Sequence, residues 1–372
     1  MIVYIAMFAY CFVMMFFIHA TEDRKKRLVC EMSILVVLGF VAGFSDLLQI
    51  SDMQVYQLAY KSTPTLGAFR FSTIHSVYGT FQMEKGFLFL FSILKTFHIG
   101  FRGFIFLHSV FFLGAFYYGV KRYTDDFAIA AMLFLYKVYF YNSFVSMRQS
   151  ITIGIFCIIV KYIEEKKILP YLAGCLIAIQ FHYAALVLIP VYFIAYIKIT
   201  KQRMAALVYG CAAVSLVINL RTLLLRIALF LPDMPFKQKL VTYFTYDTAP
   251  LQIFHTLEYL LLMTLLILFY DQIMKNNPHA EMIYKLMLAL LPILTLFRFM
   301  SVVTRLKDYF TIFYGVAFSY FYHLKRKENR ILIYMFAIGL SLFGYVRYIV
   351  SFGGGNSLLP YRNIVFQYLG IG

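Results

Sequence analysis

Residues 2–27 read IVYIAMFAYCFVMMFFIHATEDRKKR, in which a long apolar run is followed by the basic cluster Arg24–Arg27. A helix crosses the hydrocarbon core of a bilayer with about 20 apolar residues, and residues 2–19 supply nearly that length. Positive residues follow this run and none precedes it, so we interpret it as a retained helix and not as a signal peptide. Because basic loops stay in the cytoplasm, the cluster predicts that the N-terminus lies outside.

The composition of the whole chain agrees with this interpretation. Of 372 residues, 62% are hydrophobic and 14% are charged, and the mean hydropathy is +0.77. Soluble globular proteins average about 45–50% apolar and about 25% charged residues. The apolar excess excludes a soluble enzyme, a nucleic-acid-binding module, a disordered protein and a disulfide-rich secreted scaffold. The five cysteines lie in or beside apolar segments without metal-ligand spacing, so we interpret them as small apolar residues.

The distribution of apolar runs predicts an all-α polytopic membrane protein with about twelve transmembrane helices, forming a single membrane domain over residues 1–372. The predicted helices are 2–19, 31–50, 103–120, 126–142, 149–163, 168–181, 183–198, 204–222, 251–270, 283–300, 308–324 and 330–350. The compact basic clusters between the runs fall on one side, which we assign to the cytoplasm. Both termini are then expected outside.

The longer connections are expected on the opposite, outer face. Residues 51–102 form an outer loop with the apolar segment 86–97, which is too short to cross and is expected to be a re-entrant or interfacial helix. Residues 223–250 form a second outer loop, in which Pro232, Pro235 and Pro250 interrupt any long helix. Residues 351–372 form a third outer segment, and we interpret its glycine triplet 353–355 as a hinge.

Basic residues at the outer ends of helices are a second notable feature, in a chain whose net charge is +17. An arginine at depth in a membrane costs about 2.5–3.5 kcal/mol on insertion scales, so it usually faces protein or a water-filled cavity. Guanidinium groups bind phosphate oxygens bidentately, and several that converge would suit a phosphate or pyrophosphate. Snorkelling to lipid headgroups is the alternative. The residues concerned are Arg148, Arg298, Arg305, Lys307, Arg347 and Arg362.

Three further polar residues are candidates for chemistry. His182 lies between two apolar runs, where it would be a general base or, more commonly, a hydrogen-bonded structural residue. Glu84 precedes the segment 86–97, and burial at a cavity rim would raise its pKa toward catalytic use. Solvated surface charge is the alternative for Glu84 and for Asp52. No second histidine or carboxylate has metal-ligand spacing from His182, so we expect no metal site and no cofactor.

The block 142–185 is the most specific of several features that resemble one family. It holds Arg148-Gln149 at the head of an apolar run and, after a second run, Phe181-His182-Tyr183-Ala184-Ala185. These residues resemble the EpsG family, bacterial membrane proteins of exopolysaccharide and O-antigen clusters that are regarded as Wzy-type polymerases. Shorter matches follow in order along nearly the whole chain: Asp52-x-x-x-Tyr56, Glu84-Lys85-Gly86-Phe87, Arg305-x-x-x-Tyr309-Phe310 and Leu359-Pro360-Tyr361.

The resemblance implies a membrane glycosyltransferase of GT-C-like architecture in the bacterial cytoplasmic membrane. It would transfer a growing glycan from undecaprenyl pyrophosphate to a lipid-linked repeat unit on the outer face, without a metal or a nucleotide sugar. Arg148 and Arg305, with Arg298 as a third, would bind the pyrophosphate, and His182 or its rival Glu84 would be the base. The residues expected to bind sugar or lipid headgroup are Gln149, Asp52, Tyr56, Tyr309 and Tyr361. A partner that sets chain length is also implied, and nucleic acid is not.

Other classes of membrane protein compete with this interpretation. A flippase for lipid-linked oligosaccharides should have related halves and functional charges at mid-membrane, whereas the halves of this chain are not recognisably similar. An O-antigen ligase would share the donor and the arginines but use a lipid A core as acceptor. A membrane acyltransferase would prefer a histidine inside the membrane. We therefore rank a polymerase first, then a ligase and then a flippase.

Overall fold

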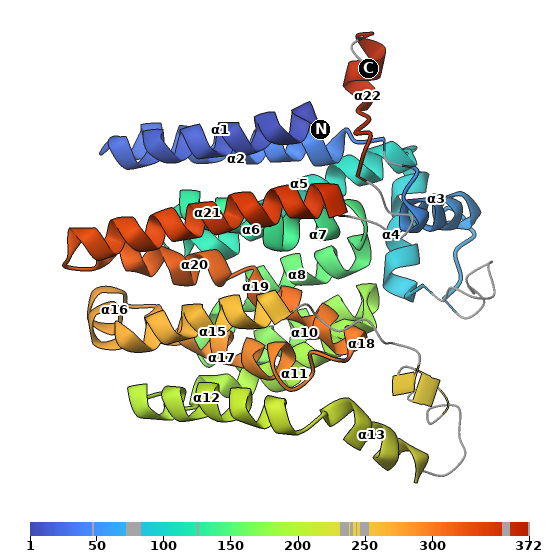
Figure 1. Cartoon of the computed structure of the whole chain (residues 1–372). Coiled ribbons are helices and arrows are strands. Elements are labelled where there is room, and N and C mark those ends of the chain that lie inside the picture. Colours follow the sequence, from blue (N-terminus) through green and yellow to red (C-terminus); the bar gives the residue numbers. More distant parts are fainter. Residues whose placement is uncertain are drawn as a thin grey trace. The chain divides into compact units, whose positions relative to one another are not determined.

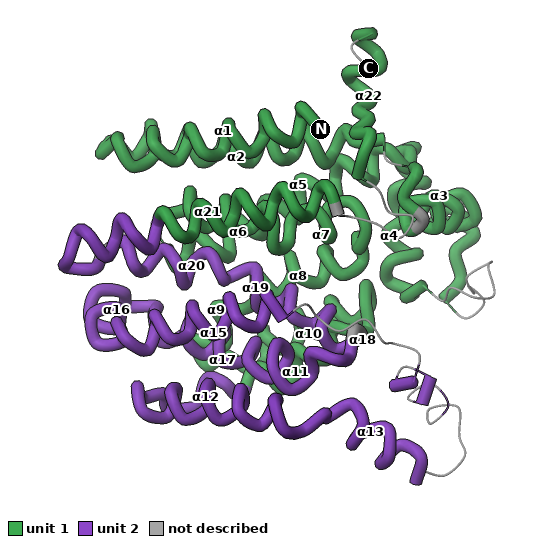
Figure 2. Tube along the Cα trace, viewed as in Figure 1, with its two compact units in different colours: residues 1–192, 335–372 green, residues 193–334 purple. Residues whose placement is uncertain are grey.

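The computed structural model describes residues 1–46, 48–71, 83–124, 126–230, 238, 241–242, 244–245, 253–351 and 358–370. Within these ranges the regular elements are helices, and one isolated bridge joins Ser45 to Asn363. The all-α prediction is therefore confirmed for this part of the chain. Two compact units are formed, unit 1 by residues 1–192 with 335–372 and unit 2 by residues 193–334 (Figure 2).

Unit 1 contains the helices that follow one another from the N-terminus to Tyr192, and the chain returns to it at the C-terminus (Figure 1). Its elements are α1 (Ile2–Ala20), α2 (Arg24–Gly43), α3 (Ser51–Ser62), α4 (Lys85–Thr96), α5 (Phe101–Lys121), α6 (Phe127–Phe134), a π-helical turn (Leu135–Tyr139), α7 (Phe140–Phe144), α8 (Met147–Ile159), α9 (Lys161–Glu164), α10 (Ile168–Phe181), a 3-10 helix (Tyr183–Val187), α11 (Leu188–Val191), the second part of α21 (Lys327–Ser351) and α22 (Ile364–Tyr368).

The helices of unit 1 pack against one another as a series that ends with α4. α1 lies against α2, α2 against α5, α5 against α8, α8 against α10, and α10 against α4. The C-terminal segment returns to the start of the unit, where the Tyr361 hydroxyl donates to Val41 O at 2.9 Å and the Tyr4 hydroxyl donates to Leu358 O at 3.1 Å. Residues far apart in the sequence thus share one core.

Unit 2 is a second group of helices, within which α17 packs against α12, α15, α19 and α20. Its elements are a 3-10 helix (Tyr192–Tyr196), α12 (Lys201–Val217), α13 (Leu220–Leu229), α15 (Ile253–Leu268), α16 (Tyr270–Asn276), α17 (Ala280–Leu294), α18 (Ser301–Thr304), a 3-10 turn (Arg305–Lys307), α19 (Asp308–Thr311), α20 (Tyr314–Ser319), a 3-10 turn (Tyr320–His323) and the first part of α21. Both units consist of apolar helices. That the two units together form a single membrane domain stays a prediction.

The described residues include four helical segments long and apolar enough to cross a membrane, which supports a membrane protein. They are Ile2–Ala20, Phe101–Lys121, Phe127–Phe144 and Lys327–Val350. Two bent helix pairs, α12 with α13 at 66° and α15 with α16 at 73°, raise this number to six if each pair is one span. The remaining predicted spans fall on shorter or interrupted helices, so a total of about twelve crossings stays a prediction.

Several predicted boundaries need correction. The helix predicted over 31–50 instead begins at Arg24, because Asp23 caps it by accepting a hydrogen bond from Lys25 N at 2.8 Å, and it ends at Gly43. The loop predicted over 223–250 begins as helix, because α13 continues to Leu229. The short helix predicted over 86–97 is present as α4. The prolines of the second loop and the glycine triplet 353–355 lie outside the described residues.

Candidate functional site

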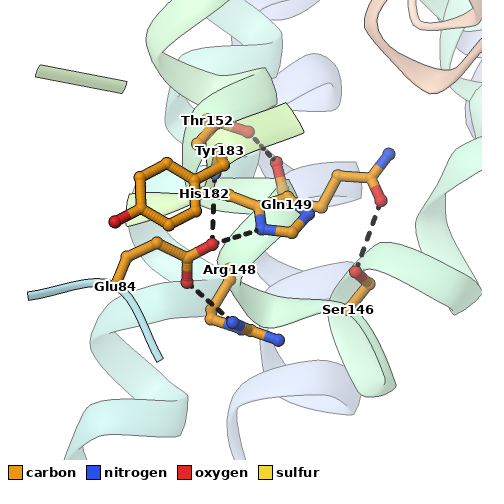
Figure 3. Close-up of polar contacts among 7 residues, drawn as sticks. All are labelled: Glu84, Ser146, Arg148, Gln149, Thr152, His182 and Tyr183. Carbon is orange, nitrogen blue, oxygen red and sulfur yellow. Dashed lines mark hydrogen bonds and ion pairs between the residues drawn. The ribbon is translucent and has the colours of Figure 1, made fainter. Parts of the chain in front are cut away.

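A buried carboxylate at the start of α4 is the centre of the candidate site. The side chain of Glu84 is only 4% exposed, and although Glu84 is the N-cap of α4 it makes no capping bond to its own helix. Its Oε1 accepts hydrogen bonds from His182 Nδ1 at 2.9 Å and from Tyr183 N at 3.1 Å. Its Oε2 accepts one from Arg148 Nη1 at 2.7 Å. Both oxygens therefore bind residues of other helices (Figure 3).

The histidine reaches Glu84 because α10 ends at this point. His182 is the C-cap of α10 and has extended backbone angles, φ −159° and ψ 122°. The following 3-10 helix starts at Tyr183, whose backbone N–H is directed to Glu84 instead of to a helical carbonyl. One break in the helix thus presents both an imidazole and a backbone donor to the same carboxylate oxygen.

Arg148 comes from the first turn of α8, two residues after its N-cap Ser146. A cation is unfavourable at the positive end of a helix dipole, and the ion pair with Glu84 offsets this cost. The guanidinium carbon also lies 5.9 Å from the ring centroid of Tyr56, which is 4% exposed and comes from α3. Arg148 Nε is buried and makes no hydrogen bond with the described residues. The arginine therefore keeps a donor beyond its bond to Glu84.

A glycine allows α4 to approach α10 closely enough for these contacts. A Cβ atom on Gly86 would lie 2.5 Å from Gln180 Cβ and 2.6 Å from Gln180 O. Neither distance is compatible with a side chain, and the second involves backbone, so one helix would have to move. We did not predict this role, although Gly86 stands in the quoted run Glu84-Lys85-Gly86, which was a weak signal for it.

The pKa of Glu84 differs from the prediction. Burial by itself raises the pKa of this carboxyl, but the hydrogen bond from His182 and the charges of Arg148 and His182 outweigh that effect and lower it to about 2. The prediction that desolvation would raise it toward catalytic use is therefore wrong, because the neighbouring donors were not visible in the sequence. Glu84 is ionised at neutral pH and is too weak a base to take a proton from a hydroxyl there.

The hydrogen-bond pattern also shows that Nδ1 of the histidine ring carries a hydrogen. An ionised carboxylate can only accept, so Nδ1 donates to it, and Nε2 is left as an acceptor whenever the ring is neutral. The His182 side chain is 26% exposed, so a ligand can approach it. A carboxylate that orients an imidazole and stabilises its protonated form is the arrangement used in acid–base catalysis. The same contacts also fasten α4, α8 and α10 together.

The structure brings together only some of the predicted site residues. Glu84, Arg148, His182 and Tyr56 form one cluster, and Asp52 is exposed one turn before Tyr56 on α3. Gln149 is 1% exposed and its amide turns away from Glu84, toward the Ser146 hydroxyl at 3.4 Å (Figure 3). Consecutive helical residues point about 100° apart, so Arg148 and Gln149 could not both face Glu84.

The remaining candidates lie elsewhere. Tyr361 donates its hydroxyl to Val41 O and packs on the Tyr4 ring at 5.2 Å, so it fastens the C-terminal segment to α1 and α2. Arg298, Arg305 and Tyr309 belong to unit 2, where Arg305 is exposed, Tyr309 is fully buried and Arg298 lies over the Phe299 ring at 4.3 Å. Their part in substrate binding stays a prediction. In the part of the chain that is described, no group of three histidine, cysteine or acidic side chains could hold a metal ion.

Comparison with known proteins identifies the family of the chain. The EpsG family model matches residues 32–363, which include every residue of the cluster, all of unit 2 and most of unit 1. No curated protein and no solved structure matches the chain. Since the match covers most of the sequence, the protein belongs to the EpsG family.

Proposed function

We propose that this protein is a polysaccharide polymerase of the cytoplasmic membrane. Membership of the EpsG family indicates an exopolysaccharide polymerase-type role and a glycosyltransferase activity. The specific reaction we propose is transfer of a growing glycan from undecaprenyl pyrophosphate to the terminal hydroxyl of a lipid-linked repeat unit. The observation that carries the proposal is the hydrogen bond between Glu84 and His182 Nδ1, which leaves Nε2 as a base.

In this reaction the acceptor hydroxyl loses its proton while it attacks the sugar. His182 Nε2 takes that proton, the acceptor oxygen forms a bond to the anomeric carbon of the donor, and the bond from that carbon to the pyrophosphate oxygen breaks. The protonated imidazole is stabilised by the Glu84 carboxylate, which remains ionised throughout. Glu84 therefore acts as a positioning residue for the base. We therefore favour His182 over Glu84 as the base.

The leaving group gains negative charge as the glycosidic bond breaks. A guanidinium held in advance at that position stabilises the charge without having to reorganise, which is a large part of catalysis in enzymes of this kind. Arg148 is suited to this because Glu84 and Tyr56 fix its position while its side chain stays 25% exposed. We assign Arg305, with Arg298 as a third cation, to the rest of the pyrophosphate.

Binding of sugars and lipid headgroup is assigned to further residues. Tyr56 belongs to the cluster itself, and Asp52 is exposed one turn away on the same helix. We keep Gln149, Tyr309 and Tyr361 as weaker candidates, since the first and second are buried and the third holds the C-terminal segment. The site is proposed to face outward from the cytoplasmic membrane, where a chain-length regulator would act with it.

The test is the size profile of the surface glycan in a strain that lacks only this gene and carries wild-type or variant copies. Loss of polymerisation leaves a single capped repeat unit without a ladder, and the wild-type copy restores the ladder. Absence of surface glycan with lipid-linked units trapped inside would replace the proposal by a flippase. Long polymer that stays on its lipid carrier would replace it by a ligase.

A further inference from the structure

An apolar groove of about 390 Å³ lies in unit 1 between α4, α5, α8 and α10. Three of these helices also supply the cluster of Glu84, Arg148 and His182. None of the residues that line this groove has a role in the proposed reaction. Its ten lining residues are aliphatic or aromatic with the exception of His108.

On two helices, residues that line the groove stand close to residues of the charged cluster. On α8, Ile151 and Ile155 line it, and they stand three and seven residues after Arg148, which places all three on one face of the helix. On α10 the lining residue Phe181 immediately precedes His182. We therefore expect a ligand that extends along the groove to have one end near the arginine and the histidine.

The single polar side chain in the lining does not make the groove polar. His108 is 3% exposed, and its Nε2 is 2.5 Å from the Ser150 hydroxyl. That hydroxyl donates to Met147 O at 2.8 Å, so it accepts from His108 Nε2–H. The hydrogen bond to Ser150 on α8 thus holds the imidazole in the wall of the groove. The other lining residues are apolar, so a ligand in the groove would contact mainly hydrocarbon.

The edge of the groove is suited to entry from a lipid bilayer. Leu107 on α5 is 42% exposed and Ile177 on α10 is 56% exposed, and both line the groove. α5 is one of the candidate membrane spans, so these apolar side chains are expected to meet lipid rather than water. A chain that lies in the bilayer could enter sideways without crossing a polar surface.

We propose that this groove binds the polyprenyl chain of the lipid-linked donor next to its pyrophosphate, with the anionic end at Arg148. The proposal rests on the proposed function, since that function supplies a donor of this class. One apolar groove that ends at one cation matches an amphiphile with a single hydrocarbon chain and an anionic head. A membrane phospholipid would leave its second chain outside.

The experiment uses the whole protein in nanodiscs and a polyprenyl pyrophosphate that carries a diazirine near its first isoprene units and no sugar. We expect light to attach the probe to groove residues, and unlabelled polyprenyl pyrophosphate to compete. Ile177→Trp, which fills the groove, should lower labelling by about tenfold or more, the loss of affinity expected when a well-packed site is blocked. Leu176→Trp is the matched control, because Leu176 is its equally exposed neighbour and does not line the groove.

A second pair protects the test against misfolding. Leu107→Trp narrows the groove from α5 and should also lower labelling, whereas Val110→Trp on the same helix should not, because Val110 is 52% exposed and does not line the groove. Unchanged labelling in both groove variants would overturn the proposal, as would competition by a phospholipid as strong as that by polyprenyl pyrophosphate. Because the probe has no glycan, its binding does not depend on polymerisation, so failure of the proposed function is read separately from the glycan size profile.

Discussion

Glu84 and His182 are separated by 98 residues in the chain, and their side chains meet at 2.9 Å between Oε1 and Nδ1. The first begins α4 and the second ends α10, so the hydrogen bond joins the ends of two helices. Arg148 joins the same carboxylate from the start of α8. Three helix ends are thus held at one anionic group, and each of the three residues can be tested separately.

Replacement of the proposed base should remove polymerisation. In His182→Ala no group can accept the proton of the acceptor hydroxyl, so we expect turnover to fall by about 10²–10⁴-fold. The measurement is polymer formation from purified lipid-linked repeat units, with the amount of variant in the membrane determined in parallel. Near-normal turnover in His182→Ala would remove this residue from the mechanism.

The stability of the protein should depend on the ionisation of Glu84. Its pKa in the folded protein is about 2, below the ordinary value of 4.5, so the carboxylate stabilises the fold above pH 4.5 and loses this contribution as the pH falls toward 2. Glu84→Gln cannot ionise, so between pH 5 and 3 its unfolding temperature should fall less steeply than that of the wild type. Thermal unfolding in detergent across this range measures the effect. Parallel curves for the two proteins would show that Glu84 is not held ionised by its partners.

Arg148 should be sensitive even to a conservative change. Arg148→Ala removes the charge beside the leaving group, and we expect a loss of about 10²–10³-fold in turnover. Arg148→Lys keeps the charge but cannot contact Glu84 and a phosphate with a planar fork, so it should recover only part of the activity. Turnover of lipid-linked repeat units at saturating substrate distinguishes the three proteins. Equal activity of Arg148→Lys and the wild type would rule out a need for the guanidinium.

The close contact of α4 and α10 can be tested with one methyl group. In Gly86→Ala the added Cβ would overlap with Gln180, so we expect the helices to separate, at a cost of about 1–3 kcal/mol, and His182 to lose its bond to Glu84. Gly114→Ala is the control, because no atom lies within 4 Å of the corresponding position on α5. Polymer formation and thermal unfolding should both fall in the first variant and stay unchanged in the second. An active, stable Gly86→Ala protein would mean that this contact does not position the site.

Arg305 tests whether unit 2 contributes to the reaction. We expect Arg305→Ala to abolish polymer while the protein remains folded in the membrane, because a cation assigned to the pyrophosphate would be lost. The matched control is Arg326→Ala, which removes an exposed arginine of the same unit from the basic run Lys325-Arg326-Lys327, a run that we assign to the cytoplasmic side. The measurement for both variants is the glycan ladder of strains that carry each variant in place of the wild-type gene. A wild-type ladder from Arg305→Ala would confine the pyrophosphate site to unit 1.

The sequence by itself determined the membrane class, the all-helical structure and the family of this protein. Apolar runs report helices reliably because length and hydropathy are local properties, and the segments 2–19 and 168–181 were predicted to within one residue of α1 and α10. The EpsG family, whose model matches residues 32–363, was predicted from sequence motifs such as Arg148-Gln149 and Phe181-His182-Tyr183. Glu84, Arg148 and His182 are all candidates on the sequence alone.

Only the tertiary structure decided how those candidates divide the work. Whether a carboxylate is a base depends on the donors around it, and those of Glu84 come from two helices far along the chain, so its pKa is lowered where the sequence predicted that burial would raise it. The structure also shows that the side chains of Arg148 and Gln149 have different partners. It further shows that Gly86 lets α4 approach Gln180 closely. These properties depend on distances between segments, and such distances are set by packing and not by the order of residues in one segment.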